Sequence, residues 1–82
     1  MKIAEYRLST HALDRLEDRE IKIDWIEKTI LNPDMVKTVS DAEVHHFKLI
    51  EEFESRFLKV VLNPEKEVIV TFHFDRRLRR WK

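Results

Sequence analysis

The chain has 82 residues, which is enough for one small domain over residues 1–82, and it contains neither cysteine nor glycine. Without cysteine there is no disulfide framework and no cysteine-ligated zinc site, and without glycine there is no glycine-rich loop to hold the phosphates of a nucleotide cofactor. The net charge is zero, but the charged side chains are unevenly distributed. Residues 1–55 carry 8 basic and 13 acidic side chains, whereas residues 56–82 carry 8 basic and 3 acidic ones.

The N-terminal part predicts a short strand and then a helix. Residues 2–8 alternate in a way that favours a strand with its even-numbered side chains turned inward. Ser9, or alternatively Thr10, is expected to be the N-cap of a helix that extends to about residue 19. The apolar side chains expected on the inner stripe of this helix are Ala12, Leu13 and Leu16.

A second helix is expected over residues 25–31, with Asp24 as its N-cap. It should end at Asn32, because Pro33 disfavours the helical conformation in the residue before it. The side chains of this helix that are expected to face inward are Trp25, Ile26, Thr29 and Ile30.

Two strands are predicted next, over residues 35–39 and 44–53, around a turn at residues 40–43. In the second strand, side chains alternate between the two faces of the sheet. The residues expected on one face are His45, Phe47, Leu49, Glu51 and Phe53, and those expected on the other are Val44, His46, Lys48, Ile50 and Glu52.

The clearest feature is a β-hairpin over residues 57–75. Residues 57–62 and 67–74 are rich in β-branched and aromatic side chains, and Pro64 in the segment between them suits a turn and not a central strand. The expected core side chains of the hairpin are Leu58, Val60, Leu62, Val68, Val70, Phe72 and Phe74. The opposite face should carry Phe57, Lys59, Val61, Glu67, Ile69, Thr71 and His73.

This element order predicts an α+β domain in which two N-terminal helices pack on one face of a four- to five-stranded antiparallel sheet. Neighbouring strands in the sequence should be neighbours in the sheet. A basic C-terminal tail, residues 76–82, should follow the last strand.

If the helices cover one face of the sheet, the other face is open and cationic. The alternation predicts on it the side chains of His46, Lys48, Lys59, Thr71 and His73. The basic tail adds Arg76, Arg77, Arg79 and Arg80. Cations of this kind favour a polyanion such as RNA, and the alternative is an ordinary solvated charged surface.

RNA supplies its own nucleophile, the 2′-hydroxyl, so that cleavage needs a base, an acid and a cation near the phosphate. His73 with Arg76 or Arg77 is one candidate catalytic set, and His11 with Arg15 on the first helix is the other. His11, Arg15 and Arg19 recur every four residues and therefore share one side of that helix.

Metal chemistry is not expected. His45 and His46 are adjacent in a strand, so they face opposite sides of the sheet and cannot chelate one metal ion together. No other cofactor is expected either. Because no stretch approaches the roughly 20 apolar residues of a membrane span, and residues 1–9 lack the apolar run of a signal peptide, a cytoplasmic protein without a membrane partner is expected.

The first helix carries the pattern Ser9-x-His11-Ala12-x-x-Arg15-Leu16-x-x-Arg19-x-Ile21, followed by Trp25-Ile26 and Asn32-Pro33-Asp34. This pattern, together with residues 58–61 and 68–71, resembles a family of small prokaryotic proteins of unassigned function. That family is placed with the RelE/ParE toxin superfamily, close to the BrnT-type toxins. The similarity spans residues 8–74. The chain departs from the family at Glu20, where the family often has glycine.

The resemblance implies a RelE/ParE-like fold and the toxin component of a type II toxin–antitoxin module. Such a toxin typically cleaves mRNA, free or on the ribosome, and is held by a cognate antitoxin protein. By motif position, the residues carried over are Ser9, His11, Arg15 and Arg19.

Two alternatives to an endoribonuclease remain. One is a non-enzymatic toxin or binding module, directed at gyrase as the ParE-type relatives are, or at an acidic protein partner through the basic tail. The other is a subunit that hides its open sheet face in a homodimer.

Overall fold

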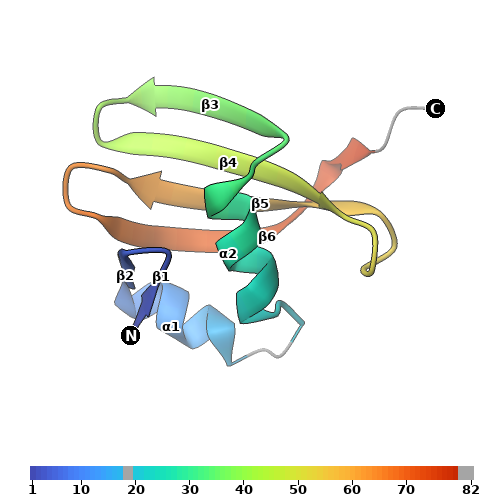
Figure 1. The fold of residues 1–82 in the computed structure, drawn as a ribbon, viewed down its shortest axis with the longest axis horizontal. Coiled ribbons are helices and arrows are strands. Elements are labelled where there is room, and N and C mark those ends of the chain that lie inside the picture. The colour runs from blue at the N-terminus through green and yellow to red at the C-terminus, as the bar shows by residue number, and fades with distance from the viewer. Residues whose placement is uncertain (18–19, 80–82) are drawn as a thin grey trace.

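The computed structural model describes residues 1–17 and 20–79, with side chains described up to residue 75. In this part of the chain, two helices and six strands occur (Figure 1). The elements are β1 (Lys2–Ile3), β2 (Tyr6–Leu8), α1 (Thr10–Leu16), α2 (Ile23–Leu31), β3 (Met35–Ser40), β4 (Glu43–Ile50), β5 (Arg56–Asn63) and β6 (Val68–Arg79). The α+β class is therefore confirmed. Neither described helix has the length and hydropathy needed to cross a bilayer.

The described strands form one mixed sheet in the order β1-β2-β6-β5-β4-β3. β3 to β6 pair antiparallel in chain order, as expected, but β2 pairs with β6 in parallel. The expectation of a four- to five-stranded, purely antiparallel sheet is thus wrong. The reason lies in the first eight residues, which form a tiny hairpin instead of one strand.

That hairpin turns at Ala4 and Glu5, which both have positive φ angles, of 51° and 71°. The turn brings β1 antiparallel against β2 and lets β2 lie beside the start of β6 (Figure 1). Ala4, Tyr6 and Leu8 pack against the core, as the expected alternation predicts, but Ile3 is buried as well, with 3% of its surface exposed, so the alternation does not hold through the turn.

Helix α1 lies along the edge of β6, beyond the end of β2 (Figure 1). Ser9 is its N-cap, as predicted: the hydroxyl accepts a hydrogen bond from the amide of Ala12 at 3.0 Å. The same hydroxyl donates to the carbonyl of Val70 in β6 at 2.7 Å. The Arg15 Nε donates to the carbonyl of Phe72 at 2.6 Å. Two carbonyls on the edge of β6 are therefore paired with α1 side chains in place of another strand.

The helix is shorter than expected, since it ends at Leu16 with Glu17 as C-cap. Ala12 is fully buried and Leu16 packs against the core, whereas Leu13 is 42% exposed and does not belong to the inner stripe. A helix that packs against a strand edge buries a narrower stripe than one that lies flat on a sheet, and Leu13 falls outside it.

Replacing Ser9 with alanine should lower the free energy of unfolding by about 1–2 kcal/mol, because one hydroxyl both caps α1 and bonds it to β6. Urea denaturation followed by circular dichroism measures the change. Thr10, the alternative N-cap, is exposed, and Thr10→Ala is the matched control with an expected loss below about 0.5 kcal/mol. Equal losses in the two variants would contradict the assignment of Ser9 as the cap.

Helix α2 crosses the sheet over β4 and β5. Its N-cap is Lys22 and not Asp24, which lies in the first turn and forms a surface ion pair with Lys28 at 3.1 Å. Asn32 ends the helix, as expected. The four side chains predicted to face inward are all buried: Trp25, Ile26, Thr29 and Ile30.

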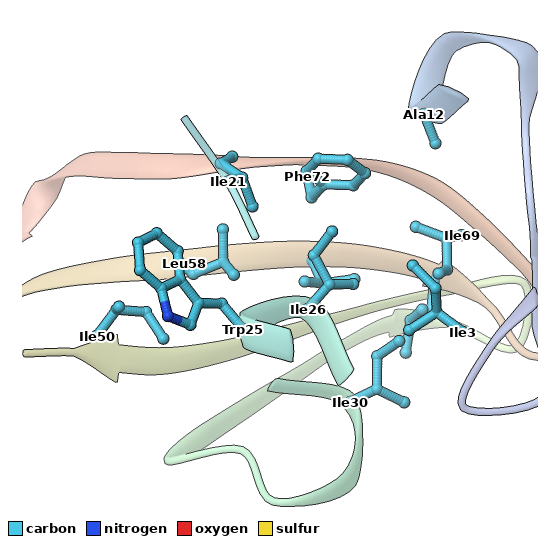
Figure 2. Close-up of a cluster of buried hydrophobic side chains, with 12 residues drawn as sticks. Ile3, Ala12, Ile21, Trp25, Ile26, Ile30, Ile50, Leu58, Ile69 and Phe72 are labelled. Carbon is cyan, nitrogen blue, oxygen red and sulfur yellow. The ribbon is translucent and has the colours of Figure 1, made fainter. Parts of the chain in front are cut away.

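The core lies between α2 and the sheet (Figure 2). Ile26, Leu58, Val60 and Phe72 have no exposed surface, and Leu62 has 1%. Ile3 from β1 and Ala12 from α1 extend the same cluster toward the N-terminal elements. One contiguous core thus fixes which face of the sheet is covered and which is open.

The core face of β6 differs from the expectation. Val61 pairs with Thr71, but Leu62 pairs with Ile69, so Val70 is an extra residue that forms a β-bulge. Ile69 is fully buried, whereas Val70 is 39% exposed. Phe72 and Phe74 do face the core, so the prediction is right after the bulge and wrong for Val68 and Val70.

The faces of β4 are the reverse of what was expected. Lys48 pairs with Leu58 and His46 with Val60, and both partners are core residues. His46 Nδ1 lies 3.2 Å from the carbonyl oxygen of Thr29 in α2, and Lys48 Nζ donates to that of Asn32 at 3.0 Å. His46 and Lys48 therefore lie on the helix-covered face and not on the open one.

Candidate functional site

The open face of the sheet is built by alternate side chains of β4, β5 and β6. Phe47, Lys59 and His73 lie opposite one another in one row across these three strands. His45 belongs to the next row, opposite Val61, which in turn pairs with Thr71. The prediction that Lys59, Thr71 and His73 share the open face is confirmed.

Phe47 is the apolar centre of this face. The Lys59 ammonium lies 5.9 Å from the centroid of the Phe47 ring, and the His45 ring lies edge-on to it at 6.4 Å. Phe47 is only 8% exposed although it lies opposite the helices. The surrounding side chains thus cover it, and their charged and polar atoms are held near one another above an apolar base.

His73 is surrounded by cations. Burial lowers its pKa below the ordinary value of 6.5, and the nearby charges of Lys59 and Arg15 lower it further. Asp75 acts in the opposite direction, and His45 adds a smaller lowering effect. His73 is therefore neutral at pH 7, which is the state that a proton acceptor needs.

Arg15 reaches this site from α1. Its hydrogen bond to the Phe72 carbonyl fixes the guanidinium at the β6 edge next to His73. Arg15 and His73 also line one open pocket of about 390 Å³ together with Glu20, Ile21, Phe53, Arg56 and Phe74. His73 of one predicted catalytic set and Arg15 of the other therefore lie together at this pocket. His11 lies one turn earlier on α1, where it is exposed.

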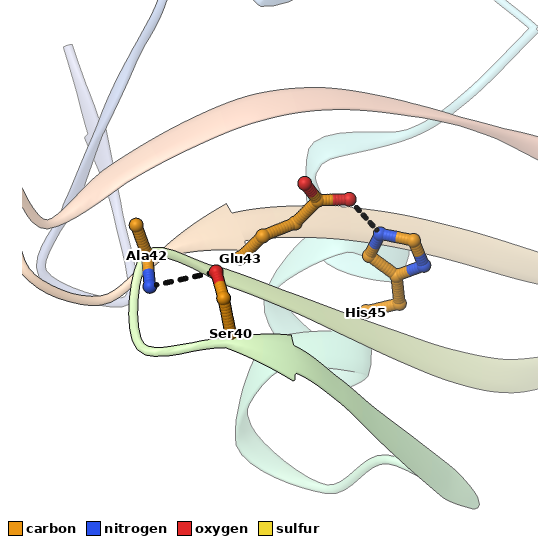
Figure 3. Close-up of polar contacts among 4 residues, drawn as sticks. All are labelled: Ser40, Ala42, Glu43 and His45. Carbon is orange, nitrogen blue, oxygen red and sulfur yellow. Dashed lines mark hydrogen bonds and ion pairs between the residues drawn. The ribbon is translucent and has the colours of Figure 1, made fainter.

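A second histidine, His45, joins the site, although it was not among the residues expected on the open face. The Nε2 atom of His45 lies 2.7 Å from a carboxylate oxygen of Glu43 (Figure 3). Both belong to β4 at a spacing of two, which puts them on one face of a strand. The spacing is visible in the sequence, but the expected alternation placed His45 on the face opposite to His46 and Lys48, which were expected to be open.

The lowered pKa of His73 can be tested without any substrate. Lys59→Gln removes the larger of the two neighbouring cationic effects, so the pKa of His73 should rise toward 6.5. Following the imidazole C2 proton by NMR over a pH series measures it. Lys37→Gln, a change on the exposed strand β3, is the control and should leave it unaltered. An unchanged His73 titration in Lys59→Gln would show that the two side chains are not neighbours in solution.

Several other predicted site residues cannot be placed in this group. His46 and Lys48 lie on the covered face, as described above. Arg76, Arg77 and Arg79 belong to β6 by their backbone, which makes this segment part of a strand that extends to Arg79 instead of a tail. The side chains of these three arginines, and Arg19 and Arg80 altogether, lie outside what the structure describes. Among the described residues, no group of three or more His, Cys, Asp or Glu side chains could hold a metal ion.

Comparison with known proteins gives one match. A family model described as "Domain of unknown function (DUF4258)" matches residues 8–78. No curated protein and no solved structure matches the chain. The matched region begins at the end of β2 and includes every described residue of the open-face site.

Proposed function

The chain belongs to the DUF4258 family, whose description assigns no function, and we propose from its site that it is an endoribonuclease. The observation that carries this proposal is the meeting of His73, Lys59 and Arg15 with the His45–Glu43 pair around one uncovered sheet face. A neutral histidine, a second histidine with a carboxylate partner and two cations are the groups that RNA transesterification needs.

In this mechanism, neutral His73 removes the proton from the 2′-hydroxyl of the RNA. The 2′-oxygen then attacks the adjacent phosphorus, and the bond from phosphorus to the 5′-oxygen breaks. The products are a 2′,3′-cyclic phosphate and a 5′-hydroxyl end. Burial and the charges of Lys59 and Arg15 lower the pKa of His73, which keeps the base unprotonated below neutral pH.

The leaving 5′-oxygen needs a proton, and His45 is the group that would supply it. The Glu43 carboxylate oxygen, 2.7 Å from His45 Nε2, holds the imidazole ring in place on the open face. Lys59, in the row between β4 and β6, and Arg15, at the edge of β6, would stabilise the additional negative charge on the phosphorane. None of these steps requires a metal ion.

We further propose that this activity serves a type II toxin, as the resemblance to RelE/ParE and BrnT-type toxins implies. The antitoxin partner would need a docking surface, and β3 supports one. All six of its residues are exposed, including Val36 at 53% and Val39 at 52%. Within the described part of the chain, β3 pairs only with β4, so its other edge can accept a strand from a partner protein.

The test of the enzymatic proposal uses purified protein and single-stranded RNA in the presence of EDTA. We expect cleavage products with 2′,3′-cyclic phosphate ends, identified by mass spectrometry. In cells, controlled expression should arrest growth with loss of RNA integrity, and co-expression of a small protein encoded next to this gene should restore it. Growth arrest with intact RNA would refute the nuclease and favour the gyrase-directed alternative.

A further inference from the structure

The pocket beside His73 has features that the cleavage mechanism does not use. Its wall includes Phe53 and Phe74, whose rings stack at 4.3 Å between centroids with an interplanar angle of 15°. The Trp25 ring packs against both, with centroid distances of 5.9 Å to Phe53 and 6.0 Å to Phe74. Phe53 and Phe74 are half-buried, so part of this aromatic cluster is in contact with the open space of the pocket.

The polar lining of the same pocket is mixed in charge. Arg15 and Arg56 contribute guanidinium groups and Glu20 contributes a carboxylate. The Arg56 guanidinium lies 3.6 Å from the Glu54 carboxylate, and their side chains are 37% and 73% exposed, so this ion pair is weak. The Arg56 guanidinium can therefore turn toward a ligand at little cost. A simple phosphate site would not be expected to contain a carboxylate.

We infer that this pocket is the subsite for a guanine base of the RNA substrate. The Watson–Crick edge of guanine presents two adjacent donors, the N1–H and the N2 amino group, which a single carboxylate can accept together. Adenine presents an acceptor at N1, which a carboxylate repels. The acceptors O6 and N7 of guanine suit a guanidinium such as that of Arg56. The aromatic wall adds apolar contact with the flat base.

His73 belongs to both the pocket and the catalytic row. A base bound in the pocket therefore brings its own ribose near His73, and the attacking 2′-hydroxyl belongs to that nucleotide. The inference for catalysis, which rests on the proposed nuclease function, is that cleavage takes place on the 3′ side of guanosine. The binding preference itself does not depend on cleavage.

Binding is measured first, by NMR titration of the protein with the 3′-monophosphates of guanosine, adenosine, cytidine and uridine. We expect guanosine 3′-monophosphate to bind at least about tenfold more tightly than the other three, and to shift resonances of Phe53 and Phe74. Glu20→Ala should remove this preference. Glu27→Ala is the control, because Glu27 is an exposed carboxylate on α2 outside the pocket. Equal binding of the four nucleotides, or a preference that survives in Glu20→Ala, would overturn the inference.

Cleavage of oligonucleotides that contain a single guanosine separates this inference from the proposed function. Cuts on the 3′ side of guanosine that become unselective in Glu20→Ala would support both. Cleavage without base preference would overturn the guanine subsite and leave the nuclease standing. Guanosine 3′-monophosphate binding in the absence of any cleavage would support the subsite and refute the nuclease.

Discussion

Alanine at position 73 should slow RNA cleavage by about 10²- to 10⁴-fold, the contribution usually made by a positioned acid or base. His73 is the open-face histidine whose pKa is lowered by burial and by Lys59 and Arg15, and it is the residue to which we assign the role of proton acceptor. The measurement is the single-turnover rate on a short RNA at several pH values. In the unmodified protein the rising limb of the pH–rate profile should have its midpoint below pH 6.5, because His73 must lose its proton to act as the base and its pKa is lowered.

Two histidines of the same chain serve as controls. His46→Ala alters a side chain on the covered face, next to the Thr29 carbonyl, and should retain the rate once folding has been verified by circular dichroism. His11→Ala tests the other predicted catalytic set, which the structure leaves one turn away from Arg15 on an exposed part of α1. Undiminished cleavage in His73→Ala, or loss in His11→Ala alone, would remove His73 from the base role.

The parts of the fold that the sequence predicted well are those set by local chemistry. The hairpin of β5 and β6 lies where β-branched and aromatic residues flank a turn with Pro64, and it occurs at that position. The inner face of α2 follows directly from a helical period of apolar residues, and all four predicted side chains are buried. In both cases one stretch of sequence contains all the information needed.

The faces of β4 could not be assigned in this way, because apolar residues occur on both. Phe47 lies on the open face and Ile50 on the core face. Counting Phe53 as a member of the strand favoured the odd-numbered face, yet β4 ends at Ile50 and Phe53 lies in the following turn, packed on Trp25 and Phe74. A strand face is inverted by a shift of one residue. Which face of β4 is covered is decided by its register with β5, and this register depends on tertiary structure.

The candidate site was predictable only in part for the same reason. Lys59 and His73 were found, because the hairpin fixes their shared face. Arg15 lies in the site because α1 packs on the edge of β6 through hydrogen bonds from Ser9 and Arg15. The periodicity of the helix does not indicate this packing. His45 was missed as a consequence of the inverted face of β4, although its spacing from Glu43 was correct for a pair.

The β-bulge at Val70 changes which side chain of β6 is buried, and mutations at Ile69 and Val70 should therefore differ strongly in their effect on the free energy of unfolding. Strict alternation would bury Val68, Val70 and Phe72, whereas the bulge buries Ile69 in place of Val70. Ile69 packs in the same cluster as Leu62 and Ile3, on the seam where β2 meets β6. Replacing Ile69 with a smaller side chain therefore opens a cavity at the junction of the N-terminal hairpin and the main sheet.

Ile69→Ala should lower the free energy of unfolding by about 2–5 kcal/mol, a large share of the roughly 5–15 kcal/mol that holds a domain folded. Val70→Ala should cost less than about 1 kcal/mol, because the side chain is 39% exposed at the bulge. Urea denaturation of both variants under one set of conditions gives the comparison. Where Ile69→Ala no longer folds, Ile69→Val provides a milder change, with an expected loss of about 0.5–1.5 kcal/mol. A greater loss in Val70→Ala than in Ile69→Ala would restore the unbroken alternation and exclude the bulge.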